Sequence, residues 1–89
     1  MRTYRKGTEE TIRRGIDWSD RLISGDYIDA STWTVGQGLT AGDSTFDDTY
    51  SDIDLSGGTV NTTYTVTNTV ETNEGMEYTR SFKIQVVTL

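Results

Sequence analysis

Residues 53–87 read IDLSGGTVNTTYTVTNTVETNEGMEYTRSFKIQVV, and this stretch predicts the fold of the chain. Large apolar side chains recur on one parity in residues 59–72 and again in residues 80–87, which is typical of strands with one buried face. They are Tyr64, Val66 and Val70 in the first segment and Phe82, Ile84 and Val86 in the second. The Asn-Glu-Gly sequence at 73–75 is a turn signal. The stretch therefore predicts a β-hairpin whose apolar face covers a core.

The residues just before this hairpin extend the pattern. Ser51, Ile53 and Leu55 alternate with Tyr50, Asp52 and Asp54, the two-residue period of a strand with one buried face, and the glycine pair at 57–58 ends that strand. The segment from residue 55 to residue 66 resembles the tyrosine corner of immunoglobulin-like sandwiches, in which a phenol (here Tyr64) bonds back to upstream backbone. We therefore expect an all-β chain that forms an immunoglobulin-like β-sandwich of six or seven strands. Its expected core residues are Trp33, Tyr64, Val66, Phe82 and Ile84.

The strand expected over residues 27–35 has an irregular pattern. Ile28 and Ala30 have one parity, whereas the later apolar residues Trp33 and Val35 have the other. Such a reversal indicates an extra residue in the strand. We expect a β-bulge near Ser31 that brings both pairs to the same face.

Residues 1–15 differ in composition from the rest of the chain. They are charged, contain glycine and have few apolar anchors, which is typical of a segment that is flexible or that a partner orders. We expect a basic N-terminal arm over 1–15, extended or partly helical, followed by a sandwich domain over 16–89. A short helix would begin with Thr8 as its cap and stop at Gly15. Trp18 is the expected hinge, and both a helical turn and a short strand fit its surroundings.

Charge is distributed unevenly along the 89 residues, which carry eight basic and fourteen acidic side chains and a net charge of −6. Residues 26–77 contain ten acidic residues and no basic residue. This acidic stretch is either a solubilising surface or a docking site for the basic arm of a neighbouring copy. The net negative charge argues against nucleic-acid binding. No apolar run is long enough to span a membrane. The predicted partner-binding residues of the arm are Arg2, Arg5, Lys6, Arg13 and Arg14.

Side chains suited to catalysis are scarce. The chain has no histidine and no cysteine, so it lacks the most common general base, the most common metal ligand and the best nucleophile. The acidic residues from Asp43 to Asp54 include oxygen ligands that calcium prefers, but they lack EF-hand spacing. Residues 41–48 have the composition of a loop, so the strand that starts at Leu39 is expected to end near Asp43. We expect no enzymatic activity, no cofactor and no metal site, with weak calcium binding by this region left open.

Five segments in order carry a family resemblance: IDWSD at 16–20, STWTV at 31–35, LSGGT at 55–59, TYTVTN at 63–68 and RSF at 80–82. This series resembles the small immunoglobulin-like structural proteins of tailed bacteriophages, the fiber–tail adaptor and head–tail neck accessory proteins. The resemblance implies a non-enzymatic virion component, assembled in the host cytoplasm, in the head–tail neck or between tail and fibers. It implies portal-adaptor, tail or fiber proteins as partners, and several copies in a ring-like assembly.

Two other functions fit the same composition. A capsid decoration protein would clamp neighbouring capsomers and would need far more copies than a ring. A host-glycan-binding module would need exposed aromatic side chains, and the pattern places most aromatic residues in the core, which counts against it.

Overall fold

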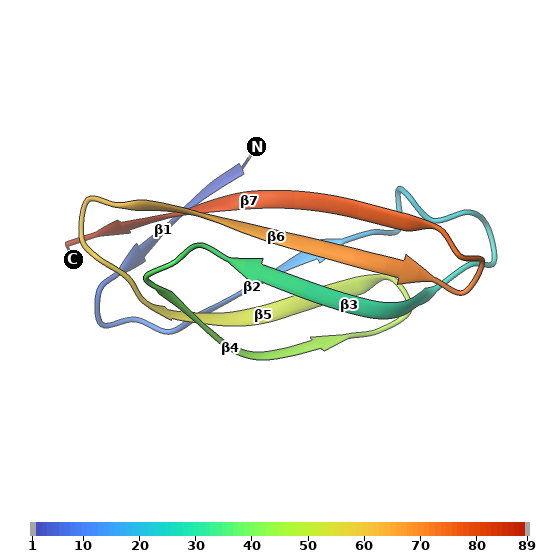
Figure 1. Ribbon diagram of the computed structural model, residues 1–89, viewed down its shortest axis with the longest axis horizontal. Helices are drawn as coiled ribbons and strands as arrows, with labels where there is room; N and C mark the ends of the chain where they lie inside the picture. Colours follow the sequence, from blue (N-terminus) through green and yellow to red (C-terminus); the bar gives the residue numbers. More distant parts are fainter. Residues whose placement is uncertain (1, 89) are drawn as a thin grey trace.

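The structure is a computed structural model that describes residues 2–88. Strands form most of this range, and buried and exposed residues alternate in the strands that line the core. These residues contain seven strands, which form a four-stranded sheet in the order β1-β7-β6-β3 and a three-stranded sheet in the order β2-β5-β4 (Figure 1). The strands are β1 (Arg2–Gly7), β2 (Ile12–Asp17), β3 (Ile28–Val35), β4 (Leu39–Phe46), β5 (Tyr50–Gly57), β6 (Thr63–Thr72) and β7 (Glu77–Val87). Within this range there is no helix long and apolar enough to cross a membrane.

The order of the strands is that of an immunoglobulin-like sandwich. The neighbours β2-β5-β4 and β3-β6-β7 correspond to the two sheets of the constant-type fold. β1 joins the larger sheet instead, where it pairs in parallel with β7. The expectation of an all-β, immunoglobulin-like sandwich of six or seven strands is therefore confirmed.

The core lies between the two sheets and is lined by alternate residues of β5, β6 and β7. Of the expected core residues, Val66 and Ile84 are completely buried, and Tyr64 and Phe82 are nearly so. The tryptophan at the centre is Trp18, which is 1% exposed, whereas Trp33 is half-buried. Trp33 belongs to β3, an edge strand, so its ring covers the side of the core and meets Phe82 edge-on, with centroids 6.0 Å apart.

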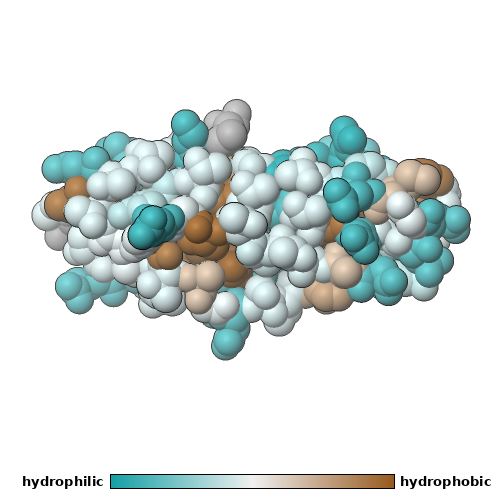
Figure 2. Space-filling view, viewed as in Figure 1, coloured by the Kyte–Doolittle hydropathy of each residue, from teal (hydrophilic) through white to brown (hydrophobic). Residues whose placement is uncertain are grey.

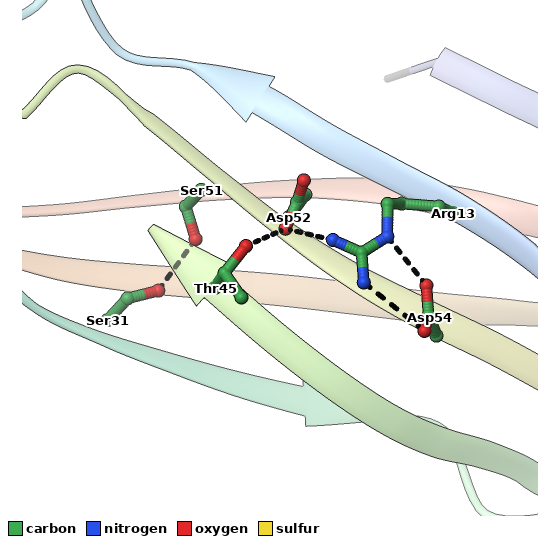
Figure 3. Close-up of polar contacts among 6 residues, drawn as sticks. All are labelled: Arg13, Ser31, Thr45, Ser51, Asp52 and Asp54. Carbon is green, nitrogen blue, oxygen red and sulfur yellow. Dashed lines mark hydrogen bonds and ion pairs between the residues drawn. The ribbon is translucent and has the colours of Figure 1, made fainter. Parts of the chain in front are cut away.

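A polar network crosses this core. Trp18 Nε1 donates to Asn68 Oδ1 at 3.0 Å, and Asn68 Nδ2 donates to Ser31 Oγ at 2.9 Å and to the carbonyl of Thr32 at 3.0 Å. Ser31 Oγ also bonds Ser51 Oγ at 2.7 Å, so the network reaches from β6 through β3 to β5 in the other sheet (Figure 3). Because buried polar atoms are costly without partners, these bonds fix the position of one sheet over the other.

The predicted tyrosine corner is present. Tyr64 Oη accepts a hydrogen bond at 2.9 Å from the amide of Thr59, five residues upstream. This contact with Thr59 lowers the pKa of the Tyr64 phenol below its ordinary value. It holds the connection between β5 and β6 against the start of β6, as in other sandwiches of this class.

The helical alternative for the N-terminal segment is wrong. Residues 2–7 and 12–17 are strands that pair with β7 and β5, and only residues 8–11 lie between them. Pairing with two sheets satisfies the backbone groups that a helix would have paired internally. Thr8 caps no helix, and the Gly7 amide donates instead to Glu10 Oε1 at 2.7 Å. The division of the chain near residue 15 stays a prediction.

Two strand details also differ from expectation. The predicted β-bulge in β3 is present, but the register between β3 and β6 shifts between Ile28 and Ala30, so the extra residue comes before Ala30 and Ala30 is exposed. β4 continues to Phe46 instead of ending near Asp43, through a second register shift between Ala41 and Ser44. The polar composition of this segment is that of an exposed edge strand, which resembles a loop in sequence.

Candidate partner-binding surface

The basic residues of the N-terminal segment lie on two sheet edges. β1 is one edge strand of the four-stranded sheet, and β2 is one edge strand of the three-stranded sheet. The predicted partner-binding residues are therefore held by backbone pairing in this structure, and their side chains have different environments.

Arg13 is occupied within the chain. Its guanidinium reaches across β5, where Nε lies 2.8 Å from Asp54 Oδ1 and Nη1 lies 3.0 Å from Asp52 Oδ1 (Figure 3). Thr45 of β4 donates to the same Asp52 oxygen at 2.6 Å. These four residues, the Arg13 clamp, join the three strands of the smaller sheet on its outer face. Asp52 and Asp54 thus bind a guanidinium, and no group of acidic residues among 2–88 has the arrangement of a metal site.

The Arg13 clamp predicts a pH dependence. The Thr45 hydroxyl first, and then Arg13, hold the pKa of Asp52 below its ordinary value despite partial desolvation. A carboxylate with a lowered folded-state pKa stabilises the fold above its unfolded-state pKa, and that stability is lost as the pH falls through the folded-state value. We expect the free energy of unfolding in urea to fall between about pH 5 and about pH 2, and to fall less steeply in Asp52→Asn.

Asp43→Asn is the matched control for this prediction, because Asp43 is an exposed aspartate on β4 outside the clamp. The free energy of unfolding of the Asp43→Asn chain should depend on pH as it does in the unmodified chain. Equal slopes for the unmodified chain and Asp52→Asn would contradict the assignment.

Lys6 is fully buried and not on the surface. Its ammonium donates to the carbonyls of Gly7 and Gly57, both at 2.7 Å. Gly57 is the last residue of β5 in the other sheet, so Lys6 ties the end of β1 across the sandwich. A buried cation needs such partners, and here backbone carbonyls provide them. Lys6 therefore contributes to the attachment of β1.

Arg2 and Arg14 lie over one aromatic ring. The guanidinium carbons of Arg14 and Arg2 are 4.6 Å and 5.4 Å from the centroid of Tyr4. Cations at this distance from an aromatic face are attracted by its quadrupole. The Nε atom of Arg14 is buried and has no hydrogen-bond partner among the described residues. Arg5, the remaining predicted residue, is exposed on β1.

A groove runs beside these arginines between β1, β2 and β7. It encloses about 490 Å³, within the range of ligand pockets. Tyr4, Ile16 and Phe82 provide apolar surface, and Arg2, Asp17 and Arg80 provide charge. We call this site, with the adjoining Arg14, the basic groove.

Arg80 is a member of this groove that the sequence reasoning missed. Its guanidinium carbon lies 4.9 Å from the centroid of the Trp18 ring, and its Nη2 lies 3.5 Å from a carboxylate oxygen of Asp20. The predicted hinge residue Trp18 thus lies in the core directly below Arg80. The sequence feature that could have indicated Arg80 is its position as the first basic residue after the acidic stretch, residues 26–77.

Exposed apolar side chains gather at one end of the sandwich, where three connecting segments meet. The Asn73 amide donates to the Tyr27 carbonyl at 3.0 Å, and the Ile28 amide donates to the Asp48 carbonyl at 2.9 Å. Figure 2 shows apolar surface at this end, on the right. We call residues 23–27, 46–48 and 73–77 the loop end. Its exposed apolar side chains are Ile23, Tyr27, Phe46 and Met76, and its acidic residues are Asp26, Asp47, Asp48, Glu74 and Glu77.

Residues 2–88 thus form a small immunoglobulin-like sandwich with a basic groove beside β1 and an apolar, acidic loop end. A family model described as Gp77, podophage GP4 fiber-tail adaptor protein gp77, matches residues 6–85. The chain belongs to this phage family, which is a family of structural proteins and not of enzymes. The resemblance seen in the sequence is thereby confirmed. None of the curated proteins matches the chain.

Proposed function

We propose that this protein is a virion component that joins fibers to the tail of a phage as a non-enzymatic adaptor. The observation that carries the proposal is the family match over residues 6–85, nearly the whole sandwich. The surface chemistry supports an assembling protein, because the basic groove and the apolar, acidic loop end are complementary surfaces for contacts between subunits.

The protein acts in several copies arranged as a ring, assembled with tail, fiber or portal-adaptor proteins in the host cytoplasm. The tail–fiber junction is favoured over the head–tail neck because the family description names fiber and tail. In the N-terminal segment, Arg2, Arg5 and Arg14 are the contact residues, since Lys6 and Arg13 bind partners within the chain.

Deletion of the gene from the phage tests this function. We expect particles with normal capsids and tails that lack fibers, and electron cryomicroscopy of unmodified particles should place the protein where fibers join the tail. Density over the capsid, with fibers kept in the deletion particles, would indicate a decoration protein. Absence of the protein from the particle would overturn the virion role.

A further inference from the structure

Most basic and acidic side chains come from different segments of this small molecule. Among the described residues, every basic side chain belongs to β1, β2, β7 or the segment that directly follows β2. Residues 26–77, which form β3 to β6 and most of the loop end, carry ten acidic side chains and no basic one. The chain therefore presents two oppositely charged surfaces, the basic groove and the loop end.

The basic groove favours an occupant that is apolar at its centre and acidic at its rim. Its surface includes the rings of Tyr4 and Phe82 in edge-to-face contact, with centroids 5.5 Å apart. Arg2 and Arg14 make no ion pair within the described residues, and the Arg14 Nε atom is buried without a partner. A guanidinium without an ion pair gains charge-assisted hydrogen bonds when a carboxylate reaches its accessible nitrogens. One carboxylate, Asp17, already lines the groove, and Asp20 lies beside it in an ion pair with Arg80.

The loop end has the complementary chemistry. Ile23, Phe46 and Met76 are 52%, 47% and 41% exposed, which is unusual for three large apolar side chains at one end of a small domain. Five acidic residues belong to the same segments, and hydrogen bonds hold these segments together. One of these runs from the Glu74 amide to Asp26 Oδ1 at 3.1 Å. The surface is therefore ordered before any contact, which lowers the entropy cost of binding.

We propose that the loop end of one copy of this protein docks in the basic groove of the next copy. Because the two surfaces are different, the contact is heterologous, and repetition of it gives a ring or an open chain instead of a two-fold dimer. Opposite charges steer the two surfaces together and disfavour the groove-to-groove and end-to-end arrangements. A ring of copies needs a contact between neighbouring copies, and this docking supplies it, so the inference rests on the proposed function.

Charge reversal on either surface tests the contact with the full chain in solution. We expect sedimentation equilibrium to show concentration-dependent association of the unmodified protein. Arg80→Glu in the groove and Glu74→Lys in the loop end should each weaken it at least about tenfold. The matched controls are Lys83→Glu on the outer face of β7 and Asp43→Lys on β4, which make the same charge changes on exposed residues outside both surfaces. Both controls should associate as the unmodified protein does.

A mixing experiment identifies the contact as heterologous. The groove variant keeps an intact loop end, and the loop-end variant keeps an intact groove. We expect each to be monomeric alone and the equimolar mixture to associate, because the intact loop end of one variant meets the intact groove of the other. A two-fold contact would give no dimer in the mixture, and that result would overturn the proposal.

Arg2→Glu is the second groove variant, because Arg80 stacks on Trp18 and its loss could disturb the core. Arg2 is exposed at the start of β1, so this change should weaken association while leaving the melting temperature unchanged. Amide chemical shifts at increasing concentration detect weak contacts. If the amide shifts of the groove and of the loop end stay constant as the concentration of the unmodified protein rises, the inference is overturned. The adaptor role would be unaffected by that result, since it depends on location in the particle.

Discussion

Gly58→Ala is expected to destabilise the sandwich by about 3–5 kcal/mol, a large part of the stability of a domain this small. Gly58 has a φ of +95°, a conformation that residues with a Cβ rarely adopt. A Cβ at this position would also lie 2.7 Å from Val86 Cγ2 and 3.3 Å from the Tyr64 ring. The change therefore adds backbone strain and overpacks the core beside the tyrosine corner. Chemical denaturation followed by tryptophan fluorescence measures the loss.

Gly75→Ala separates the two contributions to this effect. Gly75 has a similar φ of +83°, but a Cβ there would meet nothing within 4 Å. Its substitution should cost only the backbone strain, about 1–2 kcal/mol. Equal losses for the two variants would show that packing around Gly58 relaxes freely, and the overpacking argument would then be wrong.

The hairpin of β6 and β7 could be predicted because its information is local. Alternate apolar residues and a glycine turn at 73–75 identify both strands, and the Tyr64 hydroxyl contacts Thr59 only five residues away. The attachment of β1 could not be predicted in this way. It pairs in parallel with β7, and the buried ammonium of Lys6 finds the Gly57 carbonyl 51 residues later. A charged residue reads as exposed unless such a distant acceptor is known.

The candidate site was predicted only in part, because many of its contacts join residues that are far apart in the sequence. Sequence composition identified a basic N-terminal segment, but the pairing of Arg13 with Asp52 and Asp54 depends on the register between β2 and β5. Arg80 was overlooked because it is the first residue of the segment 80–87, which was expected to be a strand with one face in the core. The loop end comes from three separate segments, and only the folded sandwich brings Ile23, Phe46 and Met76 to one end.

Asn68→Ala is expected to cost about 3 kcal/mol or more, because it removes the centre of the buried polar network. The Trp18 Nε1 donor would lose its acceptor. The Ser31 hydroxyl and the Thr32 carbonyl would lose the hydrogen bonds that the Asn68 side-chain amide donates to them. Asn73→Ala, an exposed asparagine in the β6–β7 turn, is the matched control and should change the unfolding free energy little.

A thermodynamic cycle with Trp18→Phe shows whether the network itself carries this cost. Phenylalanine keeps most of the apolar contact of Trp18 but has no donor, so in that background Asn68→Ala leaves one fewer buried group without a partner. The loss caused by Asn68→Ala should therefore be smaller in the Trp18→Phe chain by about 1 kcal/mol or more. Strictly additive losses would mean that Asn68 stabilises the sandwich by filling space alone. A positive coupling would mean that a polar link through the core sets the position of β6 relative to the segment after β2, the same segment that supports the basic groove.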